Sequence, residues 1–311
     1  MNTSQLFDDK FTRGLFEDIP SPYAGDLTPL LHHAERLREC FSTKALQVFR
    51  DLDTGTIKYW QFMDLPVCEE VPPTAVEYTS HIDKRTYQSE SIIGATSLEL
   101  GSLFGYKETS KHVMYDIYPV RGYEESTSFV SSKKRLAFHT DGSAHPVISP
   151  DYVVLYCIRN EPSAVNLIVD LDDLVARISP ASLAALKTPS FRHLVSQAPV
   201  RHHVKPVLAD VDGQLTVTYD EENVTGVDRG ADEVLQELNS LLHELAREVP
   251  NKTNSLLIMN NKQALHSRTG FTPKFDGFDR WVKGAFVTKS NLPQGTLVGL
   301  SCDLVPHNNI S

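Results

Sequence analysis

The chain has 311 residues, 41% of them hydrophobic, which is enough to bury a substantial core in one large domain or two small ones. Its 30 Lys and Arg residues against 40 Asp and Glu residues give a net charge of −10, which argues against nucleic acid or an anionic membrane as the partner. The first residues contain no apolar segment typical of a signal peptide, and no apolar run approaches the roughly 18 residues that span a membrane. We therefore expect a cytoplasmic protein that binds a small molecule.

The N-terminal third has a helical pattern. Leucine and phenylalanine side chains recur at mostly helical intervals over residues 28–50, which predicts helices there. No Gly/Ser-rich or Pro-rich linker and no repeat divides the chain. We expect residues 1–311 to form one domain, with helical support over about residues 1–100 and the core over about residues 100–311.

Strand patterns dominate the middle of the chain. Apolar and β-branched runs predict strands at 113–120, 136–140 and 152–158, and a short strand at 167–169 that leads into a helix from about Asp172. Cys157 lies inside one of these runs, and the four cysteines show no C-x-x-C spacing. We therefore interpret Cys157 as a small core residue rather than a metal ligand.

The last third adds a hairpin, a helix and three strands. Asp212-Gly213 is a turn dipeptide and predicts a hairpin over 205–218, and an apolar stripe predicts a helix over 231–249. Further strands are predicted at 255–259, 263–267 and 280–288. This order indicates an α+β fold, a double-stranded β-helix (jelly roll) core with flanking helices. In such a fold, residues far apart in sequence meet at one end of the barrel.

His139 and Asp141 form the most informative motif. Side chains at i and i+2 of an extended segment point to the same side, so an imidazole and a carboxylate there can bind one metal ion. A second imidazole, for which His266 is the candidate, would complete the 2-His-1-carboxylate set that leaves positions open on Fe(II). His-x-Asp recurs at His81, but no strand pattern surrounds it, so we interpret His81 as a surface or loop residue.

Three segments resemble the clavaminate synthase-like branch of the Fe(II)/2-oxoglutarate oxygenases. They are residues 113–161 (VMYDIYPVRGYEESTSFVSSKKRLAFHTDGSAHPVISPDYVVLYCIRNE), 260–271 (NNKQALHSRTGF) and 276–287 (DGFDRWVKGAFV). The similarity covers about the last two-thirds of the chain. That branch includes arginine, asparagine and lysine hydroxylases of antibiotic pathways. The resemblance thus implies a hydroxylase of an amino acid or close derivative that uses Fe(II), 2-oxoglutarate and O2 in specialised-metabolite biosynthesis.

The resemblance also assigns residues. It implies that His139, Asp141 and His266 bind iron and that Arg280 pairs with the distal carboxylate of 2-oxoglutarate. Arg280 follows His266 by 14 residues, the interval that this branch uses. A planar guanidinium suits this role because it binds a carboxylate through two parallel hydrogen bonds. Asn166 lies where related enzymes have a Thr that contacts 2-oxoglutarate, and it could donate the same hydrogen bond.

Two features bear on the substrate. Gly284 stands where several amino-acid hydroxylases carry a second arginine that holds the substrate's carboxylate, and Asp141 replaces the more common glutamate. Either another residue replaces that arginine, or the substrate is an amino-acyl or peptidyl unit on a carrier protein. Asp220 and Glu222 repeat the i, i+2 pattern with which the arginine hydroxylase of the branch holds its cationic substrate, which indicates a basic substrate.

Alternative interpretations remain open. Arg280 could form a surface ion pair with Asp276 or Asp279. Because HTDGSAH resembles zinc-hydrolase spacing, His139, Asp141 and His145 could also form a zinc hydrolase or a non-catalytic metal site, although we expect a supporting role for His145. We expect Arg268 to be structural. Asp141 occupies the position that related halogenases leave open for halide, which favours hydroxylation, with desaturation or epoxidation as alternatives.

Overall fold

The computed structural model describes residues 6–67, 69–145, 147–197 and 200–299. After a short 3-10 helix (η1, Arg13–Phe16), the N-terminal third forms α1 (Thr28–Arg38), α2 (Thr43–Asp53) and α3 (Gln88–Leu100). The helical pattern over 28–50 is therefore confirmed, but it contains two helices. The second begins at Ser42, whose side chain accepts a hydrogen bond from the Ala45 N–H.

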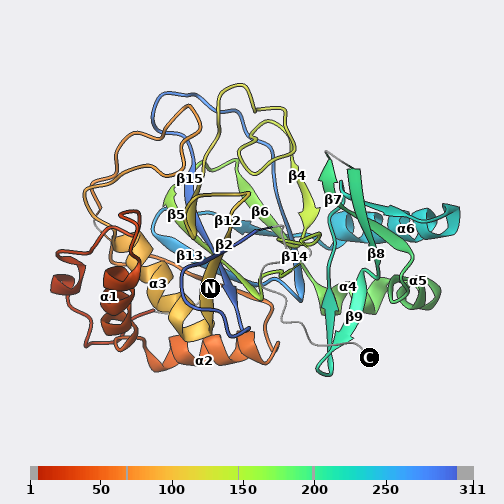
Figure 1. Ribbon diagram of the computed structural model, residues 1–311, viewed down its shortest axis with the longest axis horizontal. Coiled ribbons are helices and arrows are strands. Elements are labelled where there is room, and N and C mark those ends of the chain that lie inside the picture. The colour runs from red at the N-terminus through yellow and green to blue at the C-terminus, as the bar shows by residue number, and fades with distance from the viewer. Residues whose placement is uncertain (1–5, 68, 146, 198–199, 300–311) are drawn as a thin grey trace.

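Two β-sheets form the centre of the molecule (Figure 1). The seven-stranded sheet runs in the order β1 (Tyr59–Phe62), β13 (Ser255–Asn260), β5 (Tyr152–Arg159), β15 (Trp281–Thr288), β2 (Ser102–Tyr106) and β16 (Thr296–Val298), with β3 (Met114–Ile117) also paired to β15. The four-stranded sheet runs β12 (Arg247–Pro250), β6 (Val165–Asp170), β14 (Ala264–Arg268) and β4 (Leu136–His139). All the pairings are antiparallel except β16 with β2. This arrangement confirms the predicted double-stranded β-helix.

Each face of the seven-stranded sheet packs against a different partner. On the inner face, Val153 and Phe286 share an apolar cluster with Ile168 of the four-stranded sheet. On the outer face, Trp281 and Ala285 pack with α3 and the other N-terminal helices. Successive residues of a strand point to opposite faces of the sheet, so the side chains of β15 alternate between these two clusters. The N-terminal region also supplies β1, which pairs with β13, so it is more than helical support.

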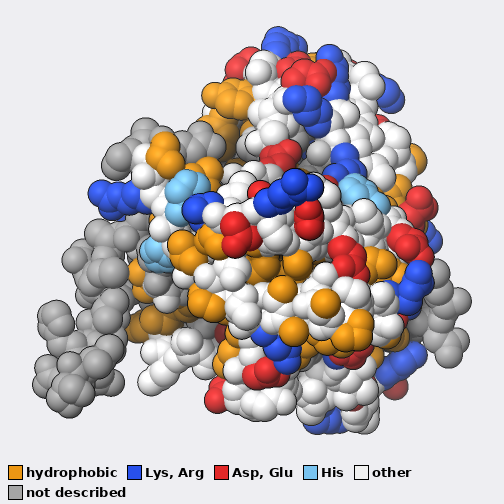
Figure 2. Space-filling view, turned by 90° about the vertical axis from the view of Figure 1, so that its right-hand side faces the viewer, with side chains coloured by type: hydrophobic (Ala, Val, Ile, Leu, Met, Phe, Trp, Pro, Cys, Tyr) orange, Lys and Arg blue, Asp and Glu red, His pale blue; other side chains and the backbone are white. Residues whose placement is uncertain are grey.

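An insertion lies on the far side of the four-stranded sheet (Figure 1). It holds α4 (Leu171–Arg177), α5 (Pro180–Leu186), β7 (Phe191–Gln197), β8 (Val200–Lys205), β9 (Leu208–Val211), β10 (Gln214–Val217), β11 (Val224–Gly226) and α6 (Arg229–Leu245). The predicted turn is present, because Asp212 and Gly213 both have positive φ, 49° and 79°, and join β9 to β10. Figure 2 views the molecule from the side of this insertion and shows basic and acidic side chains interspersed on its surface.

The predicted helix over 231–249 ends earlier than the apolar stripe indicated. Helix α6 stops at Leu245, and Arg247–Pro250 forms β12 instead. Val249 pairs with Asn166 of β6 and packs between the sheets. The backbone groups at the edge of β6 need hydrogen bonds, which favours a strand over a further helical turn here. Among the residues that the structure describes, no helix is both long enough and apolar enough to cross a membrane.

Candidate metal centre and active site

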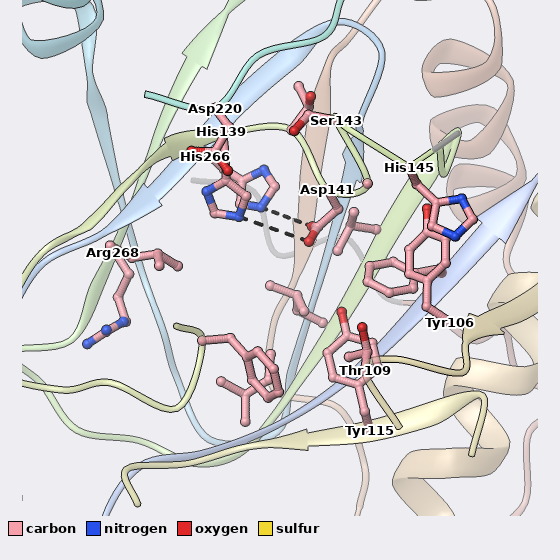
Figure 3. A pocket seen from close by; sticks show the side chains of 18 of the residues that line it. Tyr106, Thr109, Tyr115, His139, Asp141, Ser143, His145, Asp220, His266 and Arg268 are labelled. Atoms are coloured by element: carbon pink, nitrogen blue, oxygen red, sulfur yellow. Dashed lines mark ion pairs between the residues drawn. The ribbon is translucent and has the colours of Figure 1, made fainter. Parts of the chain in front are cut away.

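His139, Asp141 and His266 come together at one end of the four-stranded sheet. β4 and β14 are antiparallel neighbours, and His266 lies directly opposite His139. Their ring centroids are 4.3 Å apart. Asp141 follows the end of β4, and its carboxylate oxygens lie 3.2 Å from His266 Nε2 and 4.0 Å from His139 Nε2 (Figure 3). The predicted convergence of two distant segments is thus what the structure shows.

Hydrogen bonds orient the ligand atoms. His139 Nδ1 lies 2.9 Å from the Ala137 carbonyl oxygen, which can only accept, so Nδ1 donates this hydrogen bond and Nε2 faces Asp141. The Asp141 backbone N–H donates to Asn261 Oδ1 at 2.8 Å, and Asn261 Nδ2 donates back to the Asp141 carbonyl at 3.0 Å. Asn261 therefore holds the loop that carries Asp141, a role that the sequence motif did not reveal.

The charge balance of the three groups suits a divalent metal ion. Burial acts to raise the pKa of Asp141, but the hydrogen bond and charge of His266 outweigh it, so the pKa is lowered. Burial, together with His139, lowers the pKa of His266. The cluster contains one carboxylate and two imidazoles, with ligand atoms all within 4.8 Å of one another. These residues fit the 2-His-1-carboxylate site of Fe(II).

Arg280 is a buried cation that has no carboxylate partner among the described residues. It lines the same cavity of about 400 Å³ as the three candidate ligands. The side chain is 4% exposed, its Nε has no hydrogen-bond acceptor, and no carboxylate of the described residues pairs with it. Burial lowers its pKa to about 10. The two alternative ion-pair partners of Arg280 are engaged elsewhere. Asp279 accepts hydrogen bonds from the Lys274 and Phe275 N–H groups, and Asp276 accepts one from the Phe278 N–H.

The other arginine and the amide near this end have protein partners. Arg268 donates to the backbone carbonyls of Ser131, Ser132 and Thr269, so it is structural, as expected. Asn166 lines the cavity, and its Nδ2 donates one hydrogen bond to Asn251 at 2.9 Å. The second Nδ2 hydrogen can still serve a ligand, so the contact of Asn166 with 2-oxoglutarate stays a prediction.

The acidic segment differs from its predicted arrangement. Asp220 lines the cavity and forms a β-bridge with His139, but Glu222 is exposed and lies outside the lining. The cause is a turn, because Asp220 Oδ1 accepts from the backbone N–H groups of Glu222 and Asn223 and bends the chain outward. Glu221 turns inward instead, where it pairs with Arg135 and accepts from the Phe138 N–H.

His145 does not join the metal ligands. Its Nδ1 accepts from the N–H groups of Val147 and Ile148, and its ring packs on Tyr106 with the centroids 4.5 Å apart. Within the described residues, His139, Asp141 and His266 form the group that could hold an ion, and His145 lies outside it. This geometry favours a supporting role for His145 over the zinc-hydrolase interpretation.

Position 284 has no room for a side chain. A Cβ at Gly284 would lie 2.6 Å from Cζ of Tyr115, which stands opposite it on β3. Burial, and to a lesser degree Asp141 and Tyr106, raises the pKa of Tyr115 well above its ordinary value, so the phenol is neutral. The glycine that marked a departure from the branch pattern is thus matched by a tyrosine, which the sequence did not single out.

Comparison with known proteins identifies the family. The family described as "Taurine catabolism dioxygenase TauD, TfdA family" matches residues 25–286. The chain belongs to this family. Clavaminate synthase 2 of Streptomyces clavuligerus is 28% identical to this TauD/TfdA protein over 289 residues, which cover 88% of this chain and 87% of that protein.

Two further relatives concern amino acids. The L-lysine 3-hydroxylase of Catenulispora acidiphila is 24% identical over 236 residues, which cover 72% of this chain and 65% of that protein. A solved structure of an asparagine oxygenase with Fe(II), 2S,3S-3-hydroxyasparagine and succinate matches with a TM-score of 0.78 at 23% identity, covering 89% of this chain and 88% of that one. This likeness confirms the fold.

The expectations at family level are therefore confirmed. This TauD/TfdA protein is a clavaminate synthase-like dioxygenase related to amino-acid hydroxylases. Fe(II) and 2-oxoglutarate are the cofactor and co-substrate of this enzyme class, and the His-x-Asp and distal His of the metal site are present.

Proposed function

We propose that this dioxygenase hydroxylates an unactivated C–H bond of an amino acid or a close derivative in specialised-metabolite biosynthesis. One observation carries the proposal: the buried, unpaired guanidinium of Arg280 lies in the same cavity as the His139, Asp141 and His266 cluster. A dicarboxylate that neutralised Arg280 could reach a metal ion held by the cluster with its other end.

Each group has a role in this proposal. His139, Asp141 and His266 would hold Fe(II), Arg280 would pair with the distal carboxylate of 2-oxoglutarate, and Asn166 would donate a hydrogen bond to the co-substrate. When bound, the metal supplies the activation of O2, which is coupled to conversion of 2-oxoglutarate to succinate and CO2 and to oxygen transfer to the substrate. The chain itself orients both organic molecules and excludes water with apolar lining residues such as Ile117, Leu155 and Phe286.

A basic amino acid is the first substrate to test. Asp220 lines the cavity beside His139, and one of the relatives is a lysine 3-hydroxylase. Asp220 remains the candidate partner of a cationic group, whereas Glu222 lies outside the cavity lining. Gly284 supports a second candidate substrate, an amino-acyl or peptidyl unit whose carboxylate is masked, which would undergo the same reaction. Desaturation of the substrate is the alternative to hydroxylation.

A succinate-release screen tests the function. Protein loaded anaerobically with iron and 2-oxoglutarate is exposed to O2 with each free amino acid, starting with lysine, arginine and ornithine. We expect O2-dependent succinate and a product that has gained one oxygen atom. His266→Ala should abolish turnover, because it removes one of three metal ligands, whereas His145→Ala should keep iron and most activity.

The opposite pattern would change the assignment. If His145→Ala lost as much iron as His266→Ala, the zinc-type interpretation would move ahead. If the wild-type protein bound iron but released no succinate above a boiled control with any amino acid or amino-acid amide, hydroxylation of this substrate class would be wrong.

A further inference from the structure

Tyr115 and Gly284 form a matched pair across two strands. They are directly opposite each other in the antiparallel pairing of β3 with β15. The tyrosine ring crosses over the glycine, since a Cβ built at position 284 would lie 2.6 Å from Cζ and 2.9 Å from the hydroxyl oxygen of Tyr115. Close approach of a ring to a strand backbone requires glycine at that position. Gly284 therefore makes the room that the Tyr115 ring occupies.

The ring of Tyr115 is held firmly in the wall of the cavity. Its centroid is 5.0 Å from that of Phe286 and 6.2 Å from that of Phe129, and the residue is 6% exposed. Figure 3 shows its hydroxyl pointing into the cavity, toward the side on which Asp141 lies. The ring is thus a fixed support that presents one polar atom to the cavity.

That polar atom has no partner among the described residues. The neighbouring Tyr106 hydroxyl, by contrast, donates to the Ile148 carbonyl oxygen at 2.8 Å. A phenol hydroxyl that loses water when a ligand fills a cavity needs a new hydrogen-bond partner. Since the Tyr115 hydroxyl faces the cavity, a substrate that displaces water from it can accept that hydrogen bond.

We propose that Tyr115 is a specificity-determining residue whose hydroxyl donates a hydrogen bond to a carboxyl-group oxygen of the substrate. This inference rests on the proposed function. The cavity-lining Asp220 complements an ammonium group, which leaves the carboxyl end of an amino acid for a neutral donor. The oxygen can come from a free carboxylate or from a masked carboxyl such as an amide, and the two differ in the strength of the bond.

Tyr115→Phe tests the inference because it keeps the ring and removes the hydroxyl. The probes are the amino acid that releases most succinate from the wild-type protein and its carboxamide. We expect the apparent substrate constant to rise about 10- to 100-fold if the acceptor is a carboxylate and about 3- to 10-fold if it is an amide oxygen. The constant for 2-oxoglutarate should change by less than about twofold, since that molecule binds at Arg280.

Two further variants control for structural effects. Tyr106→Phe removes a hydroxyl that is already bonded to the chain, so it should leave the substrate constant nearly unchanged. Gly284→Ala should reproduce the loss seen in Tyr115→Phe, because its methyl group displaces the ring, while thermal unfolding reports whether the fold is intact. Unchanged constants for both probes in Tyr115→Phe would overturn the inference and leave the proposed function standing. Failure of the wild-type protein to release succinate with any probe would overturn both.

Discussion

Two buried cations at the start of β15 have opposite surroundings. Arg280 is 4% exposed, faces the cavity, and pairs with no carboxylate of the described residues. Lys283, three residues later, is completely buried on the other face of the sheet. Its Nζ lies 2.5 Å from Asp116 and 3.4 Å from Glu90, and it donates to the Tyr23 hydroxyl at 2.7 Å. Lys283 thus has protein partners on one face of the sheet, whereas Arg280, just before β15, faces the cavity without a carboxylate partner among the described residues.

The ion pairs of Lys283 belong to a larger network of buried charges beside α3. Lys84 is also completely buried and lies 2.7 Å from both Glu69 and Glu90. Asp116 accepts further hydrogen bonds from Trp281 Nε1 and from the Ile82 N–H. Removing charges from water costs several kcal/mol each, and here opposite charges and hydrogen bonds offset that cost within the protein. No carboxylate of the described residues supplies that offset at Arg280, and in our proposal the distal carboxylate of 2-oxoglutarate supplies it.

Lys283→Met should have the largest effect on stability. It leaves Asp116 and Glu90 without a buried partner, so we expect a loss of about 3–5 kcal/mol in the free energy of unfolding, measured with urea. Lys289→Met is the matched control, because Lys289 lies just beyond β15 and pairs with Asp53 at the surface. That control should change stability by less than about 1 kcal/mol. Equal effects of the two substitutions would break the comparison.

Glu90→Gln should give a smaller loss that depends on pH. Burial acts to raise the pKa of Glu90, but Lys84 and Lys283 outweigh it and lower the pKa from 4.5 to about 2. A carboxylate with a lowered folded-state pKa contributes stability above its unfolded value and loses it as the pH falls. The difference in unfolding free energy between wild type and Glu90→Gln should therefore be constant above pH 4.5 and shrink toward pH 2. A difference independent of pH would contradict the ionised network.

Arg280 substitutions should have the smallest effect on stability and a clear effect on binding. Arg280→Met removes a buried charge that has no partner, so the free energy of unfolding without 2-oxoglutarate should rise or stay within about 1 kcal/mol. Arg280→Lys keeps a charge but loses the planar fork, and the apparent constant for 2-oxoglutarate should increase about 10- to 100-fold. Dependence of succinate formation on 2-oxoglutarate concentration measures this. An unchanged constant would remove Arg280 from the co-substrate site.

The sequence predicted those parts of the molecule that depend on local pattern. Alternation and apolar runs located most strands, and the i, i+2 geometry of His139 and Asp141 indicated a metal site before His266 was placed beside them. The family resemblance, with its 14-residue interval after His266, indicated Arg280 as the partner of 2-oxoglutarate.

What the sequence missed depends on contacts between distant segments. Asn261 bonds to the loop of Asp141, and Tyr115 lies over Gly284, but neither pairing leaves a periodic signal. The i, i+2 pattern of Asp220 and Glu222 assumed an extended chain, whereas the Asp220 side chain stabilises a turn and Glu222 lies outside the cavity lining. The buried ion network was invisible for the same reason, since its carboxylates and lysines come from four separate segments.

The insertion leaves the core after β6 and returns at β12, two strands that pair with each other. Its ends are therefore fixed side by side, but its middle is also tied to β4, because Asp220 forms a β-bridge with His139 and Glu221 accepts from the Phe138 N–H. Val195 and Asp220 from this segment also reach the cavity. A change in this segment would therefore alter the cavity wall and the support of β4, which carries His139, at the same time.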